Sequence, residues 1–204
     1  MLSQLASFMQ SPTEAAMKGL RRVMLYIASN ISLCVEGYIC EGSTWEYYVD
    51  SDHAGDRNVG TRSQTGYIAF YNGIPVDWCS KKQCVTSIGS AEAEIYALSE
   101  GVKRARMLQW SAEEMGLDVQ WPMCFKVDNK ACISFQRSTN PDTRLLGVFD
   151  LREQWVRELR DMSVVVTQKV ETALNVSDLL TKCHVRQKFV DLVSLISGKT
   201  LAFY

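Results

Sequence analysis

The sequence predicts an α/β fold, and three features of the chain indicate it. Three β-rich runs follow one another between residues 45 and 80, and Asn72-Gly73 between the last two is typical of a tight hairpin turn. A long helix-forming segment opens at Ser90, and a fourth β-rich run begins at Cys124. Because a helical crossover joins parallel strands, we expect a sheet with both antiparallel and parallel neighbours.

A helix is predicted near the N-terminus. The residues Ser11-Pro12-Thr13-Glu14 are typical of a helix start, with Ser11 as the cap and Glu14 at the capping-box position. Apolar residues then recur at helical spacing as far as residue 29, forming a stripe of Met17, Leu20, Met24 and Ile27. The apolar residues 31–39 are consistent with a strand or a hairpin. We interpret residues 1–42 as a helical extension and residues 43–204 as the main domain.

Acidic residues close the first strand of the main domain. The strand is a run of β-formers that begins at Trp45, and Asp50, Asp52 and Asp56 follow it. An acid at the end of a rigid strand can bind a hard cation such as Mg²⁺, or it can simply solvate a loop. This segment alone leaves both interpretations open.

Two further strands and a helix come next. Residues 61–66 are predicted as a polar connection, residues 67–71 as the second strand and residues 74–80 as the third. The helix spans about residues 90–115, with Ser90 as a possible cap and Gly116 at its end. Glu94 shares a face with its apolar stripe, whereas Glu92 points further towards solvent and suits compensation of the helix dipole. Glu94 is therefore the better candidate ligand.

A second acid repeats the setting of Asp50. Asp128 ends the fourth β-rich run, and a helix is predicted directly after it, over residues 130–137. If the first and fourth strands are parallel, Asp50 and Asp128 emerge at the same edge of the sheet, where open α/β sheets bind ligands.

The C-terminal third is predicted to contain a helix over residues 148–161, a buried strand within residues 163–170 and a helical region from Asn175. Asp178 lies at the start of that region. It is either an acid that compensates the helix dipole or a further ligand.

Composition narrows the class of protein. The 204 residues are 47% hydrophobic and 22% charged, with a formal net charge of −1, so no overall basic charge indicates a nucleic-acid binder. The seven cysteines contain no Cys-x-x-Cys pair, and their spacing with His184 does not favour zinc. We expect reduced thiols in a soluble intracellular protein, cytoplasmic or nuclear, with no membrane span.

Taken together, these motifs resemble the ribonuclease H domain of Copia-type retrotransposon Pol polyproteins. The similarity extends over about residues 46–184. It rests on blocks in a fixed order: Val49-Asp50-Ser51-Asp52-His53-Ala54-Gly55-Asp56, Thr61-Arg62-Ser63-Gln64-Thr65-Gly66-Tyr67, Trp78-Cys79-Ser80-Lys81-Lys82-Gln83, Ser90-Ala91-Glu92-Ala93-Glu94, Val127-Asp128-Asn129, Asp150-Leu151-Arg152 and Ser177-Asp178-Leu179-Leu180-Thr181-Lys182. Residues 12–40 also resemble the segment that joins reverse transcriptase to ribonuclease H.

The resemblance implies a ribonuclease H-like fold with a mixed five-stranded sheet flanked by helices. It implies that Asp50, Glu94, Asp128 and Asp178 form the acidic tetrad of the family, which would act as catalytic residues and metal ligands. The implied cofactor is a pair of Mg²⁺ ions, with Mn²⁺ as a substitute, and the implied reaction is hydrolysis of the RNA strand of an RNA–DNA hybrid. A reverse transcriptase domain in a longer polyprotein is an implied partner.

Lys81, Lys82 and Arg104 are candidates for substrate binding through phosphate contacts, although for each of them taken singly a solvated face is the more common setting. One departure from the family concerns the start of the helix predicted over residues 148–161. Family members carry Arg-Thr-Lys-His-Ile-Asp where this chain has Leu145-Leu146-Gly147-Val148-Phe149-Asp150, so basic residues are lost. Two hypotheses follow: a metal-dependent ribonuclease H, or a catalytically silent remnant that binds nucleic acid or a partner.

Overall fold

The computed structural model describes residues 2–31, 44–53, 61–137 and 151–197 of the chain. Its strands are β1 (Trp45–Asp52), β2 (Gln64–Tyr71), β3 (Ile74–Lys82), β4 (Met123–Val127) and β5 (Val165–Lys169). Its helices are α1 (Leu2–Ala6), α2 (Glu14–Ser29), α3 (Ser90–Glu114), α4 (Lys130–Arg137), α5 (Leu151–Asp161), the 3-10 helix η1 (Val176–Leu180) and α6 (Arg186–Ser197).

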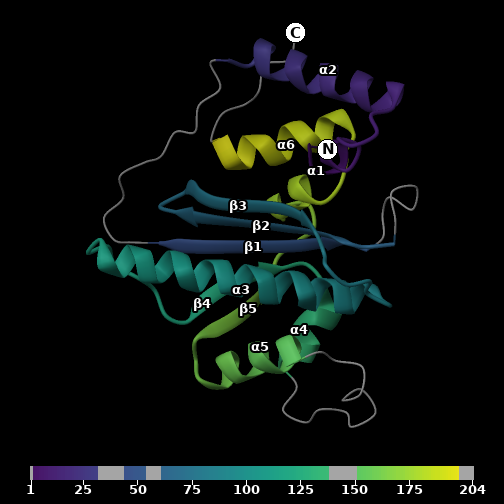
Figure 1. Ribbon diagram of the computed structural model, residues 1–204. Coiled ribbons are helices and arrows are strands. Elements are labelled where there is room, and N and C mark those ends of the chain that lie inside the picture. Colours follow the sequence, from purple (N-terminus) through teal and green to yellow (C-terminus); the bar gives the residue numbers. More distant parts are fainter. Residues whose placement is uncertain (1, 32–43, 54–60, 138–150, 198–204) are drawn as a thin grey trace.

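The five strands form one mixed sheet, which confirms the mixed five-stranded sheet that the resemblance implies, and their order is β3-β2-β1-β4-β5. Neighbours from β3 to β1 are antiparallel, whereas β4 is parallel to both β1 and β5. Helices α3, α4 and α5 cover one face of the sheet, and η1, α6 and the N-terminal helices lie on the other side (Figure 1).

The hairpin between β2 and β3 confirms the turn predicted from Asn72-Gly73. Asn72 has a φ of 50° and Gly73 a φ of 76°. Two consecutive residues with positive φ are what a two-residue hairpin needs for its twist to match that of the strands. This turn fixes the antiparallel half of the sheet.

A glycine lets α3 pack closely against the sheet. Tyr47 of β1 stacks on Phe125 of β4 with ring centroids 5.0 Å apart, and both side chains are fully buried. Opposite them, a Cβ atom added to Gly101 would lie only 2.7 Å from Val49 Cγ1. Glycine at this position therefore lets α3 approach β1, which brings the first turns of α3 towards the end of that strand.

Two predicted helix caps are wrong. The cap of α2 is Thr13 and not Ser11, because the Thr13 side chain accepts a hydrogen bond from the Ala16 amide at 3.1 Å. At the start of α3, Gly89 is the capping residue and Ser90 is the first helical residue, with no side-chain cap.

Two strands also differ from the prediction. β2 begins at Gln64 instead of residue 67, because residues 64–66 continue the antiparallel ladder with the end of β1. β5 is buried on one face only: Val165 and Thr167 are buried and Val166 is 41% exposed, so it alternates instead of being covered on both sides.

The apolar stripe predicted on α2 is exposed in this structure, at Met17, Leu20, Met24 and Ile27. The buried residue of α2 is Val23, while Tyr26 contacts Phe189 of α6 edge to face. Most of residues 31–39, Asp56 and the predicted helix start at residue 148 lie outside the described residues, and the division at residue 42 stays a prediction. In the described ranges, no helix is both long enough and apolar enough to cross a membrane.

Candidate metal centre

Asp50 and Asp128 meet at one edge of the sheet, as their strand-end positions predict. Tyr47 of β1 pairs with Phe125 of β4, and the two acids each lie three residues further along these parallel strands. Asp50 is still within β1 and has no solvent exposure, whereas Asp128 directly follows β4 and is partly exposed. The parallel register therefore brings two carboxylates together that are 78 positions apart in the sequence.

Glu94 reaches the same point from α3. It lies in the first turns of the helix and is only 5% exposed, on the face that packs against β1. Glu92 instead accepts a hydrogen bond from the Ile88 amide at 2.6 Å, so it serves the helix start. The structure separates the two acids as the helical spacing predicts.

Asp50, Glu94 and Asp128 form a compact acidic group. One carboxylate oxygen from each lies within 4.8 Å of those from the other two. Oxygen ligands from carboxylates are those that hard divalent cations prefer. The arrangement can therefore hold a metal ion in the Mg²⁺ class.

Burial changes the acidity of this group. Burial first, and then the charges of Asp178 and Asp128, raise the pKa of Asp50 to about 7, although Lys182 and Thr181 act in the opposite direction. Burial and the charges of Asp50 and Asp128 raise the pKa of Glu94 to about 8. Three acids held close together without a cation repel one another, so a bound cation would favour their ionised forms.

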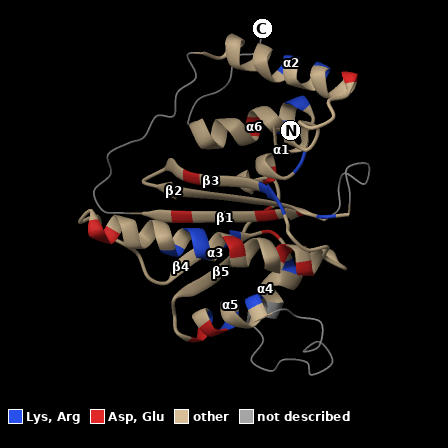
Figure 2. Ribbon diagram, viewed as in Figure 1, with Lys and Arg blue, Asp and Glu red and all other residues tan. Residues whose placement is uncertain are grey.

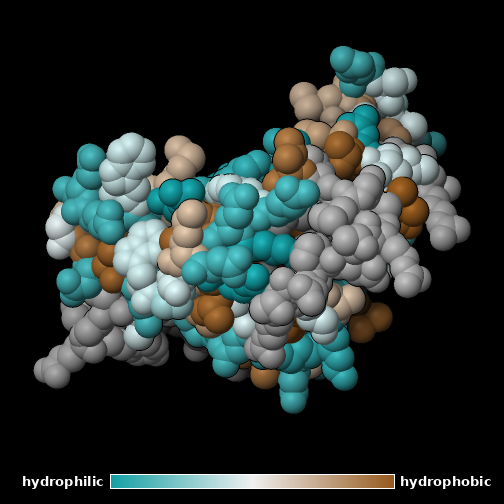
Figure 3. Space-filling view, turned by 90° about the horizontal axis from the view of Figure 1, so that it is seen from below, coloured by the Kyte–Doolittle hydropathy of each residue, from teal (hydrophilic) through white to brown (hydrophobic). Residues whose placement is uncertain are grey.

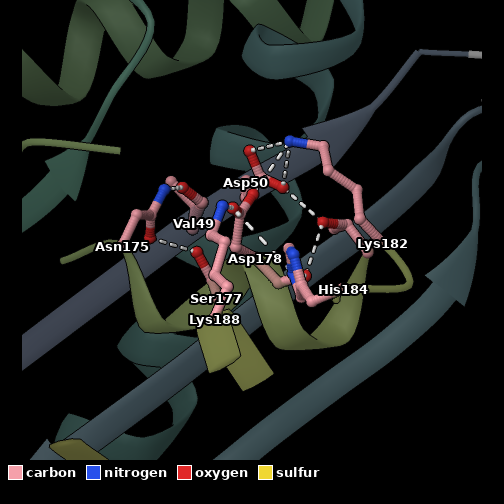
Figure 4. Close-up of polar contacts among 9 residues, drawn as sticks. Val49, Asp50, Asn175, Ser177, Asp178, Lys182, His184 and Lys188 are labelled. Atoms are coloured by element: carbon pink, nitrogen blue, oxygen red, sulfur yellow. Dashed lines mark hydrogen bonds and ion pairs between the residues drawn. The ribbon is translucent and has the colours of Figure 1, made fainter. Parts of the chain in front are cut away.

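Asp178 lies beside Asp50 but is bound by cations (Figure 4). One carboxylate oxygen lies 2.9 Å from Lys182 Nζ, and the other lies 2.6 Å from Lys188 Nζ. Burial opposes ionisation of Asp178, but the hydrogen bonds from these two lysines outweigh it and lower the pKa of the carboxyl. His184 Nε2 lies 3.0 Å from the backbone carbonyl oxygen of Asp178 and can donate to it.

Lys182 contacts both Asp50 and Asp178. Its Nζ atom lies 3.2 Å from Asp50 Oδ2 as well as 2.9 Å from Asp178 Oδ1. Burial disfavours the charged lysine, but the two carboxylates outweigh burial and raise its pKa. Lys182 thus remains a cation between Asp50 and Asp178.

Neutral side chains fix η1 against β1. The buried Asn175 donates from Nδ2 to the Val49 carbonyl oxygen at 3.2 Å and accepts from Ser177 Oγ at 2.6 Å. Thr181 donates from Oγ1 to an oxygen of Asp50. These contacts hold Asp178 next to Asp50, although more than 120 residues separate them in the chain.

The three predicted substrate-binding residues line one small pocket. Lys81 and Lys82 from β3 and Arg104 from α3 surround a cavity of about 90 Å³, together with residues of β2. Arg104 is already engaged, because its Nε atom donates to Asp77 Oδ2 at 3.0 Å. Figure 2 shows basic and acidic residues interspersed along α3 instead of one surface of a single charge.

The sequence predicts four site acids, and the structure places Asp50, Glu94 and Asp128 in one group with Asp178 beside Asp50, while their catalytic role stays a prediction. The sequence alone assigned no role to Asn175, Thr181 or Lys182. Thr181 and Lys182 belong to the same sequence motif as Asp178, and this closeness in the sequence is the signal that could have marked them as site residues. Nothing in the local sequence marks Asn175, whose partner lies on a distant strand. Asp52, at the end of β1, is outside the acidic group.

The chain is similar to retrotransposon polyproteins. It is 27% identical over 185 residues to the retrovirus-related Pol polyprotein from transposon TNT 1-94 of Nicotiana tabacum, a match that covers 89% of this chain. It is 25% identical over 197 residues to the corresponding protein from transposon RE1 of Arabidopsis thaliana, covering 96% of this chain. The chain spans about 13% of the length of each of these relatives.

A shorter relative and a solved structure add to this comparison. The secreted RxLR effector protein 161 of Plasmopara viticola is 35% identical over 101 residues, which are 50% of this chain and 70% of that protein. The crystal structure of LC11 ribonuclease H1, isolated from compost, matches the fold with a TM-score of 0.51 and 12% identity, covering 68% of this chain and 92% of that one. No family model matches the chain.

Proposed function

We propose that this chain, which is homologous to retrovirus-related transposon Pol polyproteins and has a ribonuclease H-like fold, is a metal-dependent ribonuclease H. In this proposal it hydrolyses the RNA strand of an RNA–DNA hybrid. The fold and the relatives support a nuclease-like hydrolase, and the convergence of Asp50, Glu94 and Asp128 is the observation that carries the chemistry.

The residues present fit a divalent cation. Glu94 Oε2 is buried and has no hydrogen-bond partner among the residues that the structure describes. A buried carboxylate oxygen without a partner is costly, and a cation is the partner that would satisfy it. Asp50 and Asp128 would bind beside it, with two Mg²⁺ ions, or Mn²⁺ in their place, as the proposed cofactor.

In the proposed hydrolysis, the main task of the protein is to hold the cations and the carboxylates in position. Bound Mg²⁺ would supply an activated water and would stabilise the leaving oxygen of an in-line displacement. Asp50 and Glu94 would hold their oxygens in fixed positions because β1 and α3 are rigid elements packed on one core. Asp178 would complete the proposed catalytic set of Asp50, Glu94, Asp128 and Asp178, provided that Lys182 or Lys188 moves away from it.

Phosphate contacts would hold the hybrid. Lys81 and Lys82 share one pocket with Thr65 of β2, whose pairing partner Ser51 directly follows Asp50. This closeness to the acids supports a role in binding the substrate backbone. Arg104 would contribute once its bidentate pair with Asp77 opens.

The relatives suggest the wider context. Both plant relatives are Pol polyproteins, so we propose that the domain works with a reverse transcriptase domain of a longer polyprotein. Residues 1–42 would then be a helical remnant of the connection between the two. The alternative is a catalytically silent remnant that binds nucleic acid or a partner, which the lysines bound to Asp178 favour.

Cleavage of a labelled RNA–DNA hybrid in Mg²⁺ tests the proposal. We expect Asp50→Asn and Glu94→Gln to abolish cleavage, while Glu92→Gln, on the same helix but outside the acidic group, keeps it. EDTA should stop cleavage and Mn²⁺ should restore it. If the wild type and both active-site variants behave alike, the enzyme hypothesis fails and the silent remnant stands.

A further inference from the structure

A groove of about 530 Å³ lies along the second half of α3. Its walls include three of the five tryptophans of the chain: Trp110 from α3, Trp121 from the segment before β4 and Trp155 from α5. The charged residues that line the same groove are Lys103, Arg106 and Glu113 of α3, two basic and one acidic. Figure 3 views the molecule from the side of α4 and α5, where apolar residues stand in separate places among hydrophilic ones.

Two of the tryptophans, Trp110 and Trp155, lie on helices, and Trp121 lies just before β4. Trp110 is 67% exposed and Trp121 is 45% exposed, whereas Trp155 packs partly against the hydrophobic core. Tryptophan is highly buried on average, so two exposed rings in one groove indicate a surface that another molecule covers. Since α3 is packed on the core, the groove needs little ordering when it binds.

The basic side chains of Lys103 and Arg106 indicate which kind of partner the groove binds. Lys103 makes an exposed pair with Glu100 at 2.9 Å, and such a pair is readily exchanged for another anion. Arg106 is exposed one helical turn before Trp110. Indole faces beside cations are the combination that binds single-stranded nucleic acid, because bases stack on the rings while phosphates contact the cations.

The groove is separate from the acidic edge. Trp110 follows Glu94 by 16 residues, which is about 24 Å along the helix and roughly 160° around its axis. Glu94 faces the core, so the groove opens on the other side of α3. A hybrid held at the acids is therefore not held by the same contacts as a strand in the groove.

We propose that this groove binds single-stranded DNA. The identity of the strand rests on the proposed function, because hydrolysis of the RNA strand leaves a DNA strand with unpaired bases. Trp110 and Trp121 supply the stacking surfaces, and Lys103 and Arg106 contact the phosphates.

Fluorescence anisotropy of a dye-labelled dT12 strand, measured in EDTA so that no cleavage occurs, tests this inference on the full chain. Loss of one stacked base should weaken binding about 5- to 150-fold, so we expect effects in this range for Trp110→Ala and Trp121→Ala. Trp78→Ala is the matched control, because Trp78 is 60% exposed on β3, away from the groove, and its loss should change affinity less than twofold. Arg106→Ala should reduce the salt slope by about 0.7.

Four results would overturn the inference, and the first three concern binding. The inference fails if the protein does not bind dT12 at low salt, or if both tryptophan variants still bind it. It also fails if the protein binds rU12 in place of dT12. A dimer in light scattering that Trp110→Ala converts to monomer would also overturn it, because the groove would then join two copies. Circular dichroism confirms that each variant is folded.

The proposed function can fail independently. Asp50→Asn should bind dT12 like the wild type, and Trp110→Ala should still cleave the hybrid. If no protein cleaves but dT12 binding depends on Trp110, the groove stands and the ribonuclease proposal falls.

Discussion

The ammonium of Lys182 lies 3.2 Å from an oxygen of Asp50, a fully buried residue of β1, and 2.9 Å from an oxygen of Asp178. The lysine therefore occupies the space between two acids that we propose as metal ligands. Lys188 contacts the other oxygen of Asp178 at 2.6 Å, so that acid has two cationic partners while Asp50 has one. Lys182 and Lys188 therefore neutralise the part of the acidic edge that contains Asp178, and the group of Asp50, Glu94 and Asp128 lies next to it.

Replacing Lys182 should destabilise the metal-free protein. Lys182→Met leaves Asp50 without its cation, and we expect a loss of roughly 1–3 kcal/mol in the free energy of unfolding by urea. This is less than for a fully buried pair, because the lysine side chain is 34% exposed. Added Ca²⁺ should recover much of the loss. Lys188→Met is the control, since Asp50 keeps Lys182; an equal effect of both variants would contradict the prediction.

The metal-free domain should lose stability as the pH rises. The folded-state pKa values of Asp50, about 7, and Glu94, about 8, lie above the ordinary values of 3.8 and 4.5. The folded protein therefore binds more protons than the unfolded chain in this window, so the free energy of unfolding falls as pH rises towards 8. The slope should not exceed about 1.4 kcal/mol per pH unit for each group.

Urea unfolding in EDTA at several values between pH 5 and 8 measures this slope. Glu94→Gln should flatten it, because the amide does not titrate. Stability that increases over the same range in EDTA would show that the buried acids are not the dominant titrating groups.

Asp178 should contribute to metal binding although it is not within the three-acid group. We expect Asp178→Asn to weaken binding of Ca²⁺, measured by calorimetry, by about 10- to 100-fold, as loss of a ligand or of a partner that orients one does. Asp191→Asn on α6 is an exposed control that should leave affinity unchanged. If Asp178→Asn binds Ca²⁺ like the wild type, Asp178 only anchors the lysines.

Gly66 should be essential for the position of η1. Gly66 pairs with Asp50 across β1 and β2, and a Cβ atom there would lie 2.7 Å from the Ser177 carbonyl oxygen. Backbone must therefore shift in Gly66→Ala, and we expect a loss of about 1–3 kcal/mol together with weaker hybrid cleavage. Gly89→Ala is the control for added bulk, since its Cβ would meet nothing within 4 Å and its loss of stability is limited to a weaker cap of α3. Equal melting temperatures for the two variants would contradict this account.

Lys81 should contribute one phosphate contact to hybrid binding. For Lys81→Ala, the slope of log affinity against log salt should decrease by about 1, with a similar loss for different hybrid sequences. The measurement uses an uncleavable complex in Ca²⁺. Lys18→Ala on the exposed face of α2 is the matched control. An unchanged slope for Lys81→Ala would place this residue on a solvated surface.

Local sequence determined the elements whose causes are local. Asn72-Gly73 fixed the hairpin because positive φ is easily adopted by those two residues, and helical spacing separated Glu94 from Glu92. The helix caps were less predictable, since Ser11 and Thr13 are both good capping residues and the chain used the second. The strand start at Gln64 depends on pairing with β1, which residues 61–66 alone do not reveal.

By itself, the sequence determined the α/β class, the order of the elements in the main domain and the four candidate acids, because periodicity and turn residues act over a few positions. The tertiary structure alone decided how those acids associate. The parallel register of β1 and β4 brings Asp128 to Asp50, and the glycine at position 101 brings α3 close enough for Glu94. It also placed Lys182 between Asp50 and Asp178, because contacts between charged side chains depend on distances between elements that are remote along the chain.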